Sequence, residues 1–342
     1  MNESLTPRQM LKGLLQGTPP PRPLFLPIVF SLGAKVENLP LRAFLGNATK
    51  ISNSLRQIRA HLRSDGVSCY FDPFLEAEAL GAEVRWTADD QPPALHWSHP
   101  SEMGELPENL RSPEDAAKSG RVNVAVEVIR RLKSLLRDEP LLSAGVAGPF
   151  TLAARLTGLQ QADAPQREHF SDAALELATA TITQVASKLV EAGAGVIFIQ
   201  EDILPPLSAS SCEAWASSLA PAFNIIRFYE ALPVLQISDG DAFAQNKPVI
   251  FRQQWNCILC PPLASSAPTA AALAPPPDCA NIGIAVPPAV FQPGAASSPE
   301  NFQQLLHTIV VELRPALVTT AGDVPATTDI KLLAKTWEAI HR

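Results

Sequence analysis

The sequence predicts an α/β protein folded as a closed (β/α)8 barrel, a TIM barrel, with a small hairpin excursion after the second strand. Eight short apolar runs alternate with helical patterns along the 342 residues, which is typical of parallel βαβ units. The runs are continuously apolar, as expected of strands covered on both faces. The alternative fold is an open doubly wound sheet. That fold typically has a glycine-rich phosphate-binding turn after its first strand, and the sequence contains no such turn. We therefore expect residues 1–342 to form one barrel domain.

The predicted strands are short runs rich in Val, Ile, Leu and Phe, bounded by turn residues. The first run contains Pro27, which has no N–H to give to a sheet. The eight strands are expected at residues 24–30, 67–71, 141–147, 196–200, 233–238, 257–260, 281–286 and 316–319. A hairpin outside the barrel is expected at residues 82–86 and 94–97.

The predicted helices follow the strands, and several begin at recognisable capping residues. Thr6 followed by Pro7 indicates one start. Ser112 followed by Pro113 and two acidic residues indicates another. The helices are expected at residues 6–16, 41–62, 112–137, 166–192, 212–231, 268–274, 299–313 and 329–341. The pattern is weakest between residues 239 and 277.

Composition excludes several classes of function. The formal net charge is -7 and no basic cluster offsets it, which argues against nucleic-acid binding. No apolar run reaches the roughly 18 residues that a membrane span needs, and the N-terminus lacks the pattern of a signal peptide. Five irregularly spaced cysteines do not form the pattern of a disulfide framework. We therefore expect a cytoplasmic protein that binds neither nucleic acid nor a membrane.

Polar residues at the carboxyl ends of the predicted strands are the site candidates, because the βα loops of a barrel carry its functional groups. The candidates are Asp72, Arg155, Glu201, Asp202, Gln236 and Ser238. Each also has a structural interpretation. Asp72 could end a strand, Arg155 could be solvated, and the two acids at 201 and 202 could cap a helix. No histidine near Ser238 suggests itself as a base, so a serine hydrolase is not predicted.

Two residue pairs have metal-ligand spacing, but both have simpler interpretations. Cys257 and Cys260 have no second pair to complete a site, so we interpret them as packed thiols. His96 and His99 fall in the hairpin excursion, which indicates a surface loop. The sequence therefore predicts no metal site.

Four segments in collinear order carry a family resemblance over nearly the whole chain. The stretch 70–83, YFDPFLEAEALGAE, places Asp72 seven residues before Ala79. It resembles the aspartate signature of the uroporphyrinogen decarboxylase superfamily, whose fold is a (β/α)8 barrel. GPFTL at 148–152, EAGAGVIFIQE at 191–201 and VTTAGDVP at 318–325 resemble further elements of that superfamily.

The sequence departs from both main chemistries of the superfamily. The decarboxylases carry paired arginines after the first strand, whereas this chain has SLGAK at 31–35. The corrinoid-linked methyltransferases bind zinc through His-x-Cys after the fifth strand and a Cys after the eighth. Gln236 and Ser238 replace the first two ligands here, and Gly322 lies at or beside the third. Of the decarboxylase site, Asp72 alone transfers cleanly.

The resemblance therefore implies three alternatives. The preferred one is cofactor-independent decarboxylation of a carboxylated pyrrole or a similar anionic small molecule. In it, Asp72 would hold pyrrole N–H groups and stabilise the charge on the protonated ring, and Arg155 or Arg252 would replace the missing carboxylate clamp. The second is a methyltransferase that lacks the zinc site, and the third is a non-catalytic binding barrel. The family also implies a homodimer with facing mouths.

Overall fold

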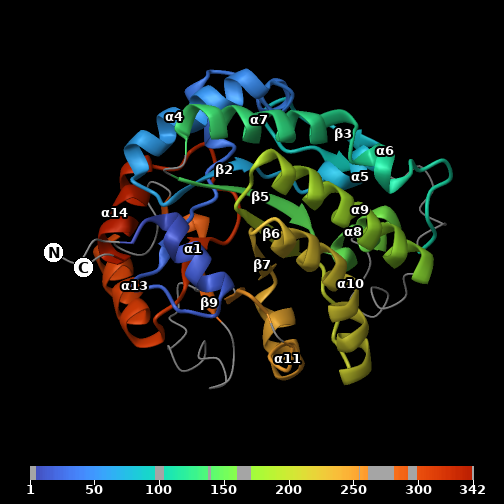
Figure 1. Cartoon of the computed structure of the whole chain (residues 1–342). Helices are drawn as coiled ribbons and strands as arrows, with labels where there is room; N and C mark the ends of the chain where they lie inside the picture. The colour runs from blue at the N-terminus through green and yellow to red at the C-terminus, as the bar shows by residue number, and fades with distance from the viewer. Residues whose placement is uncertain are drawn as a thin grey trace.

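The computed structural model describes residues 5–96, 104–137, 140–159, 171–253, 255–260, 281–291 and 299–340. Eight parallel strands form a nearly closed barrel surrounded by helices (Figure 1). The strands are β1 (Leu24–Phe25), β2 (Gly66–Tyr70), β5 (Leu141–Ala147), β6 (Val196–Glu201), β7 (Leu232–Ile237), β8 (Ile258–Cys260), β9 (Ile282–Val286) and β10 (Leu317–Thr320). Their order is β1-β10-β9-β8-β7-β6-β5-β2, with every neighbouring pair parallel. The predicted barrel and its eight strands are thus confirmed.

The seam between β1 and β2 is bridged mainly by side chains. The Asp65 carboxylate accepts from the Phe25 N–H at 2.8 Å, while the Asp65 N–H donates to the Phe25 carbonyl at 3.0 Å. Farther along the seam, the Val29 N–H donates to Ser68 Oγ at 2.8 Å. Pro27 supplies no N–H, which accounts for a β1 ladder of two residues where seven were predicted. The β1 ladder is formed with β10, and across the seam the Asp65 and Ser68 side chains supply acceptors that hold the first run against β2.

The helices follow the predicted alternation, with short additional ones near the strand ends. They are α1 (Pro7–Leu15), α2 (Leu32–Val36), α3 (Leu41–Leu45), α4 (Ala48–Leu62), α5 (Leu75–Leu80), α6 (Pro113–Ala116), α7 (Gly120–Leu136), α8 (Pro149–Leu156), α9 (Asp172–Ala192), α10 (Ala209–Phe228), α11 (Gly240–Ile250), a 3-10 turn (Pro288–Phe291), α13 (Pro299–Leu313) and α14 (Ile330–Ile340). The predicted helix at 41–62 is two helices, because Asn47 leaves the helical conformation and caps α4. The helix predicted at 268–274 lies outside the described residues.

The predicted hairpin excursion is confirmed as an antiparallel pair of β3 (Val84–Arg85) and β4 (Ala94–Leu95). Its connecting loop is tied to α3. The Arg42 N–H donates to the Asp89 carbonyl at 2.9 Å, and the Arg42 guanidinium lies 5.6 Å from the centre of the Trp86 ring. The excursion thus lies against the loop that follows β1.

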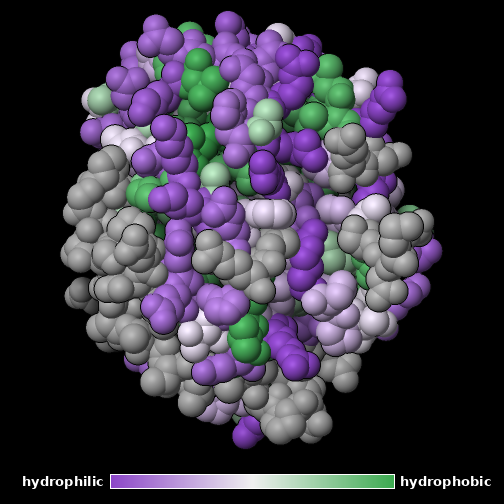
Figure 2. Space-filling view, turned by 90° about the vertical axis from the view of Figure 1, so that its left-hand side faces the viewer, coloured by the Kyte–Doolittle hydropathy of each residue, from purple (hydrophilic) through white to green (hydrophobic). Residues whose placement is uncertain are grey.

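The face of the molecule drawn in Figure 2 carries mainly polar side chains among the described residues. Figure 2 shows the left-hand side of the view in Figure 1, where hydrophilic residues cover much of the described surface and hydrophobic ones form small groups. Within the described ranges, no helix combines the length and the apolar character that crossing a membrane requires.

Candidate functional site

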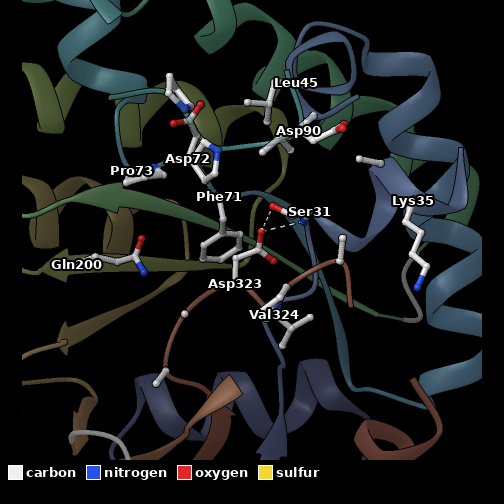
Figure 3. Close-up of a pocket in the computed structure, with 18 of the residues that line it drawn as sticks. Ser31, Lys35, Leu45, Phe71, Asp72, Pro73, Asp90, Gln200, Asp323 and Val324 are labelled. Carbon is white, nitrogen blue, oxygen red and sulfur yellow. Dashed lines mark hydrogen bonds between the residues drawn. The ribbon is translucent and has the colours of Figure 1, made fainter. Parts of the chain in front are cut away.

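The barrel mouth holds a cavity of about 630 Å³ (Figure 3). Residues after β1, β2, β6, β7 and β10 line it, together with the loop of the hairpin excursion. Leu39, Leu41, Leu45, Phe71 and Val324 give it a largely apolar wall. Its volume suits a small organic molecule, and its position is the usual one for a site in this fold.

Asp72, the principal site candidate, lies at this mouth directly after β2. Its side chain is 1% exposed and forms an ion pair with Arg121 of α7. The other carboxylate oxygen accepts from the Phe74 N–H at 2.9 Å. Burial raises the pKa of Asp72, and the Arg121 charge opposes that shift. Both oxygens therefore already have protein partners.

Arg121, the partner of Asp72 behind the cavity lining, was not predicted from the sequence. It also pairs with Glu78 of α5, so it joins two carboxylates that follow β2. Arg121 lies 49 positions after Asp72 in an ordinary helical pattern, so no local signal connects the two.

Arg155 and Asp202, predicted from different strand ends, form an ion pair of 2.5 Å. The Arg155 side chain is 7% exposed, donates to the Pro73 carbonyl and lies 5.3 Å from the centre of the Phe74 ring. Arg155 is therefore behind the wall of the cavity, whereas Asp202 lines it. The second Asp202 oxygen accepts from Ser238 Oγ at 2.6 Å, so β7 joins the same cluster.

Gln236 connects the ends of β7 and β10. Its amide nitrogen donates to the Ala321 carbonyl at 2.9 Å, and its amide oxygen accepts from Gln200 at 3.3 Å. Gln236 is 1% exposed, whereas Gln200 lines the cavity. Gln200 was not among the predicted site residues, although it is the last residue of the predicted fourth strand.

Glu201, predicted as a substrate-binding residue, lies in the barrel wall and is not among the residues that line the cavity. It is fully buried and accepts from the N–H groups of Phe150 and Thr151, from the Thr151 hydroxyl and from the Trp215 indole. These bonds cap α8, whose own N-cap residue is Gly148. A Cβ on Gly148 would lie 2.1 Å from the Glu201 carboxyl carbon. Burial raises the pKa of Glu201 to about 7.

Arg252, predicted as a carboxylate clamp, is exposed after α11 and is not among the residues that line the cavity. Cys257 and Cys260 are buried at β8, away from the cavity lining. His96 is half-buried at the end of the excursion, and His99 lies outside the described residues.

Asp323, after β10, is a half-buried residue whose carboxylate holds the loop after β1. It accepts from the N–H groups of Phe30 and Ser31 at 2.7 and 2.8 Å and from the Ser31 hydroxyl. Figure 3 shows this contact beside Phe71. Burial raises the pKa of Asp323 to about 6. Its side chain therefore connects the loop after the first strand with the loop after the last strand.

The side chains at the ends of β7 and β10 do not fit a zinc–thiolate centre. Gln236 donates a hydrogen bond to the Ala321 carbonyl, Ser238 donates one to Asp202, and Gly322 has no side chain. Amide and hydroxyl groups are not usual zinc ligands. In the described ranges, no group of three His, Cys, Asp or Glu residues is arranged to hold a metal ion.

Acidic side chains predominate around the cavity. Asp72, Asp90, Asp202 and Asp323 line it, and Lys35 is the one basic lining residue in the described part of the chain. Lys35 is exposed and lies across the cavity from Gln200 (Figure 3). Arg121 and Arg155 neutralise two of the carboxylates from behind. In the described part of the chain, Lys35 is therefore the one basic side chain of the cavity lining that could bind an anionic ligand.

Comparisons with known proteins agree with this architecture. The Uroporphyrinogen decarboxylase (URO-D) family model matches residues 6–222. The methylated-thiol–coenzyme M methyltransferase of Methanosarcina mazei is 30% identical over 185 residues, which are 50% of this chain and 46% of that relative. The match thus spans less than half the length of that protein.

Solved structures share the fold at low sequence identity. A methyltransferase from Methanosarcina mazei has a TM-score of 0.77 and 16% identity over 98% of both chains. A putative vitamin-B12 independent methionine synthase from Listeria monocytogenes has a TM-score of 0.56 and 11% identity, covering 92% of this chain and 95% of that one. At such identities the likeness extends to the fold alone.

Proposed function

The chain belongs to the uroporphyrinogen decarboxylase family, and from that premise we propose that its mouth binds a small methyl donor of neutral or positive charge for methyl transfer without a zinc–thiolate centre. The observation that carries the proposal is the charge of the cavity. Four aspartates and one lysine line it, Arg121 and Arg155 pair with two of these aspartates from behind, and its wall is largely apolar. A substrate with many carboxylates would meet the remaining acidic side chains and the apolar wall, with Lys35 as the one basic lining residue in the described part of the chain, which is unfavourable.

Methyl donors fit such a cavity for a chemical reason. A methyl group transfers readily from a nitrogen or sulfur atom that leaves as a neutral amine or thioether, so its carrier is commonly a cation. The methyl carbon bonds to the acceptor, and the electron pair of the broken bond stays with the leaving atom. The partial match to a methyltransferase supports the same class of reaction. The residues of the mouth would bind and orient the donor and exclude water.

The test measures methyl transfer to a reduced corrinoid. Purified protein is incubated anaerobically with cob(I)alamin and small donors of matched size that are cationic, neutral or carboxylated, with a protein-free control. We expect methylcobalamin, detected by its visible spectrum, to form faster than in the control with cationic or neutral donors. Equal rates with and without protein for every donor would overturn the proposal.

Decarboxylation of a carboxylated pyrrole is a second candidate, favoured by the position of Asp72 at the mouth. Both Asp72 oxygens have protein donors, so a pyrrole N–H would have to share them. We therefore expect weak or undetectable turnover of uroporphyrinogen in an anaerobic assay followed by chromatography. Efficient formation of the four-carboxylate product, abolished in Asp72→Asn, would establish this candidate instead.

A further inference from the structure

The amide groups at the ends of β6 and β7 have an orientation that their partners determine. The Ala321 carbonyl can only accept, so the Gln236 group beside it, at 2.9 Å, is the amide nitrogen. The Gln236 oxygen therefore faces Gln200, which must present its nitrogen. The Gln200 carbonyl oxygen is left as an acceptor, and no group in the described ranges donates to it.

Asp202 and Ser238 add further acceptors beside Gln200. Each Asp202 oxygen receives one protein hydrogen bond, from Arg155 or from Ser238, whereas a carboxylate oxygen can accept two. The Asp202 side chain is 34% exposed, so its remaining lone pairs are accessible from the cavity. Ser238 uses its proton on Asp202 and keeps its oxygen lone pairs. We call Gln200, Asp202 and Ser238 the acceptor edge.

The opposite parts of the cavity offer a ligand little hydrogen bonding. Asp72 is 1% exposed with a partner on each oxygen, Asp323 accepts three hydrogen bonds, and the Ser31 hydroxyl is taken by Asp323. The further charged lining residues, Asp90 and Lys35, are exposed at the outer part of the mouth. The wall of leucines, Phe71 and Val324 is apolar. A ligand that donates hydrogen bonds at one end and is apolar at the other would match this division.

Resting on the proposed function, we infer that the acceptor edge selects a donor that carries an N–H group, namely a protonated N-methylated amine. A quaternary ammonium or a sulfonium ion has the same charge but no hydrogen to donate. Either would cover the acceptor edge and remove its water without replacing the hydrogen bonds, which is costly for a partly buried carboxylate. The acidic lining thus favours cations over anions, and the acceptor edge favours cations that carry an N–H group.

The test uses a series of constant charge. Binding is measured by calorimetry at neutral pH for benzylammonium and its N-methyl, N,N-dimethyl and N,N,N-trimethyl derivatives, with phenylacetate as the anion. We expect the first three to bind with similar affinity and the trimethylated ion about tenfold more weakly, the loss of one charged hydrogen bond. The phenyl ring is expected to lie on the apolar wall.

Variants separate hydrogen bonding from size. In Asp202→Asn, the difference between the dimethyl and trimethyl ions should shrink, whereas a difference due to size alone would stay. Ser238→Ala retains the ion pair between Arg155 and Asp202 and frees the Asp202 oxygen that accepted from Ser238, so the difference should grow in this variant, which keeps the test valid if Asp202→Asn folds poorly. Asp241→Asn is the matched control, because Asp241 is exposed on α11 outside the cavity lining and its loss removes the same charge.

The outcomes distinguish this inference from the proposed function. If the trimethylated ion binds as tightly as the dimethylated one, or if the difference between them is unchanged in both variants, the N–H requirement is wrong while a preference for cations stands. If phenylacetate binds more tightly than every ammonium ion, the proposed function fails together with the inference. A loss of affinity in Asp241→Asn as large as in Asp202→Asn would also overturn the inference, since general charge would then explain it.

Discussion

Replacing Arg121 by methionine should destabilise the barrel strongly, because it leaves Asp72 buried without its counter-charge. The Asp72 side chain is 1% exposed and that of Arg121 11%, so water cannot easily replace the lost partner. Removing one member of a buried ion pair typically costs about 3–5 kcal/mol. Glu78 also loses a partner, but at 33% exposure solvent compensates much of that loss. We expect a decrease of about 3 kcal/mol or more in the unfolding free energy at neutral pH.

The assay is denaturant unfolding of the wild type, Arg121→Met, Asp72→Asn and the double variant. The double variant has no uncompensated charge, so it should recover most of the loss. Arg131→Met is the matched control on the same helix. Arg131 pairs with Glu127 at the surface, with both side chains at least 40% exposed, and its loss should cost under about 1 kcal/mol.

The pH dependence gives a second check on the same reasoning. The pKa of Asp72 is already raised in the folded protein, and removing Arg121 raises it further. A carboxyl group with a raised pKa favours folding when protonated, and this contribution is lost as the pH rises through the folded pKa. The deficit of Arg121→Met should therefore shrink in acid. A deficit below about 1 kcal/mol at neutral pH, or no recovery in the double variant, would refute the reasoning.

Three further predictions concern the rest of the mouth. Elemental analysis should find no stoichiometric zinc, because Gln236 and Ser238 replace the ligands. Gly145→Ala should cost about 1–3 kcal/mol in thermal or denaturant unfolding, since the new Cβ would lie 2.7 Å from Phe71 Cδ1. The pKa of Asp323 is raised to about 6, so its contribution to stability is complete in acid and is lost as the pH rises through 6. The stability advantage of the wild type over Asp323→Asn should therefore fall by about 3 kcal/mol between about pH 4 and pH 7.

The strands were predictable because parallel strands buried on both faces appear as continuous apolar runs. β5 and β9 coincide with such runs almost residue for residue. The short helices α2, α5, α8 and α11 were missed, because fewer than a dozen residues show too little periodicity. The N-terminus of α8 is also capped by Glu201, which lies 50 positions after Thr151, so no local sequence pattern predicts where α8 begins.

The candidate site was predictable in position but less so in the role of each residue. Asp72, Asp202 and Ser238 reach the cavity because the carboxyl ends of parallel strands meet at one end of a barrel. That rule places a residue at the mouth without fixing which way its side chain turns. Glu201 turns outward to α8, and its neighbour Asp202 lines the cavity. Arg121 reaches the mouth from a helix, where the rule does not apply.

The hydrogen-bond partners of the carboxylates separate structure from function at this mouth. Asp72 and Glu201 are buried and have protein donors on both oxygens, and Asp323 accepts three hydrogen bonds, so their removal should appear mainly as lost stability. Asp202 also has one donor on each oxygen, but its side chain is 34% exposed at the cavity, so its remaining lone pairs are accessible, and Gln200 and Ser238 line the cavity with it. Changes at these three positions should therefore appear mainly as lost affinity. The two roles therefore meet at the end of β6, where Glu201 stabilises the barrel wall and the next residue, Asp202, lines the cavity.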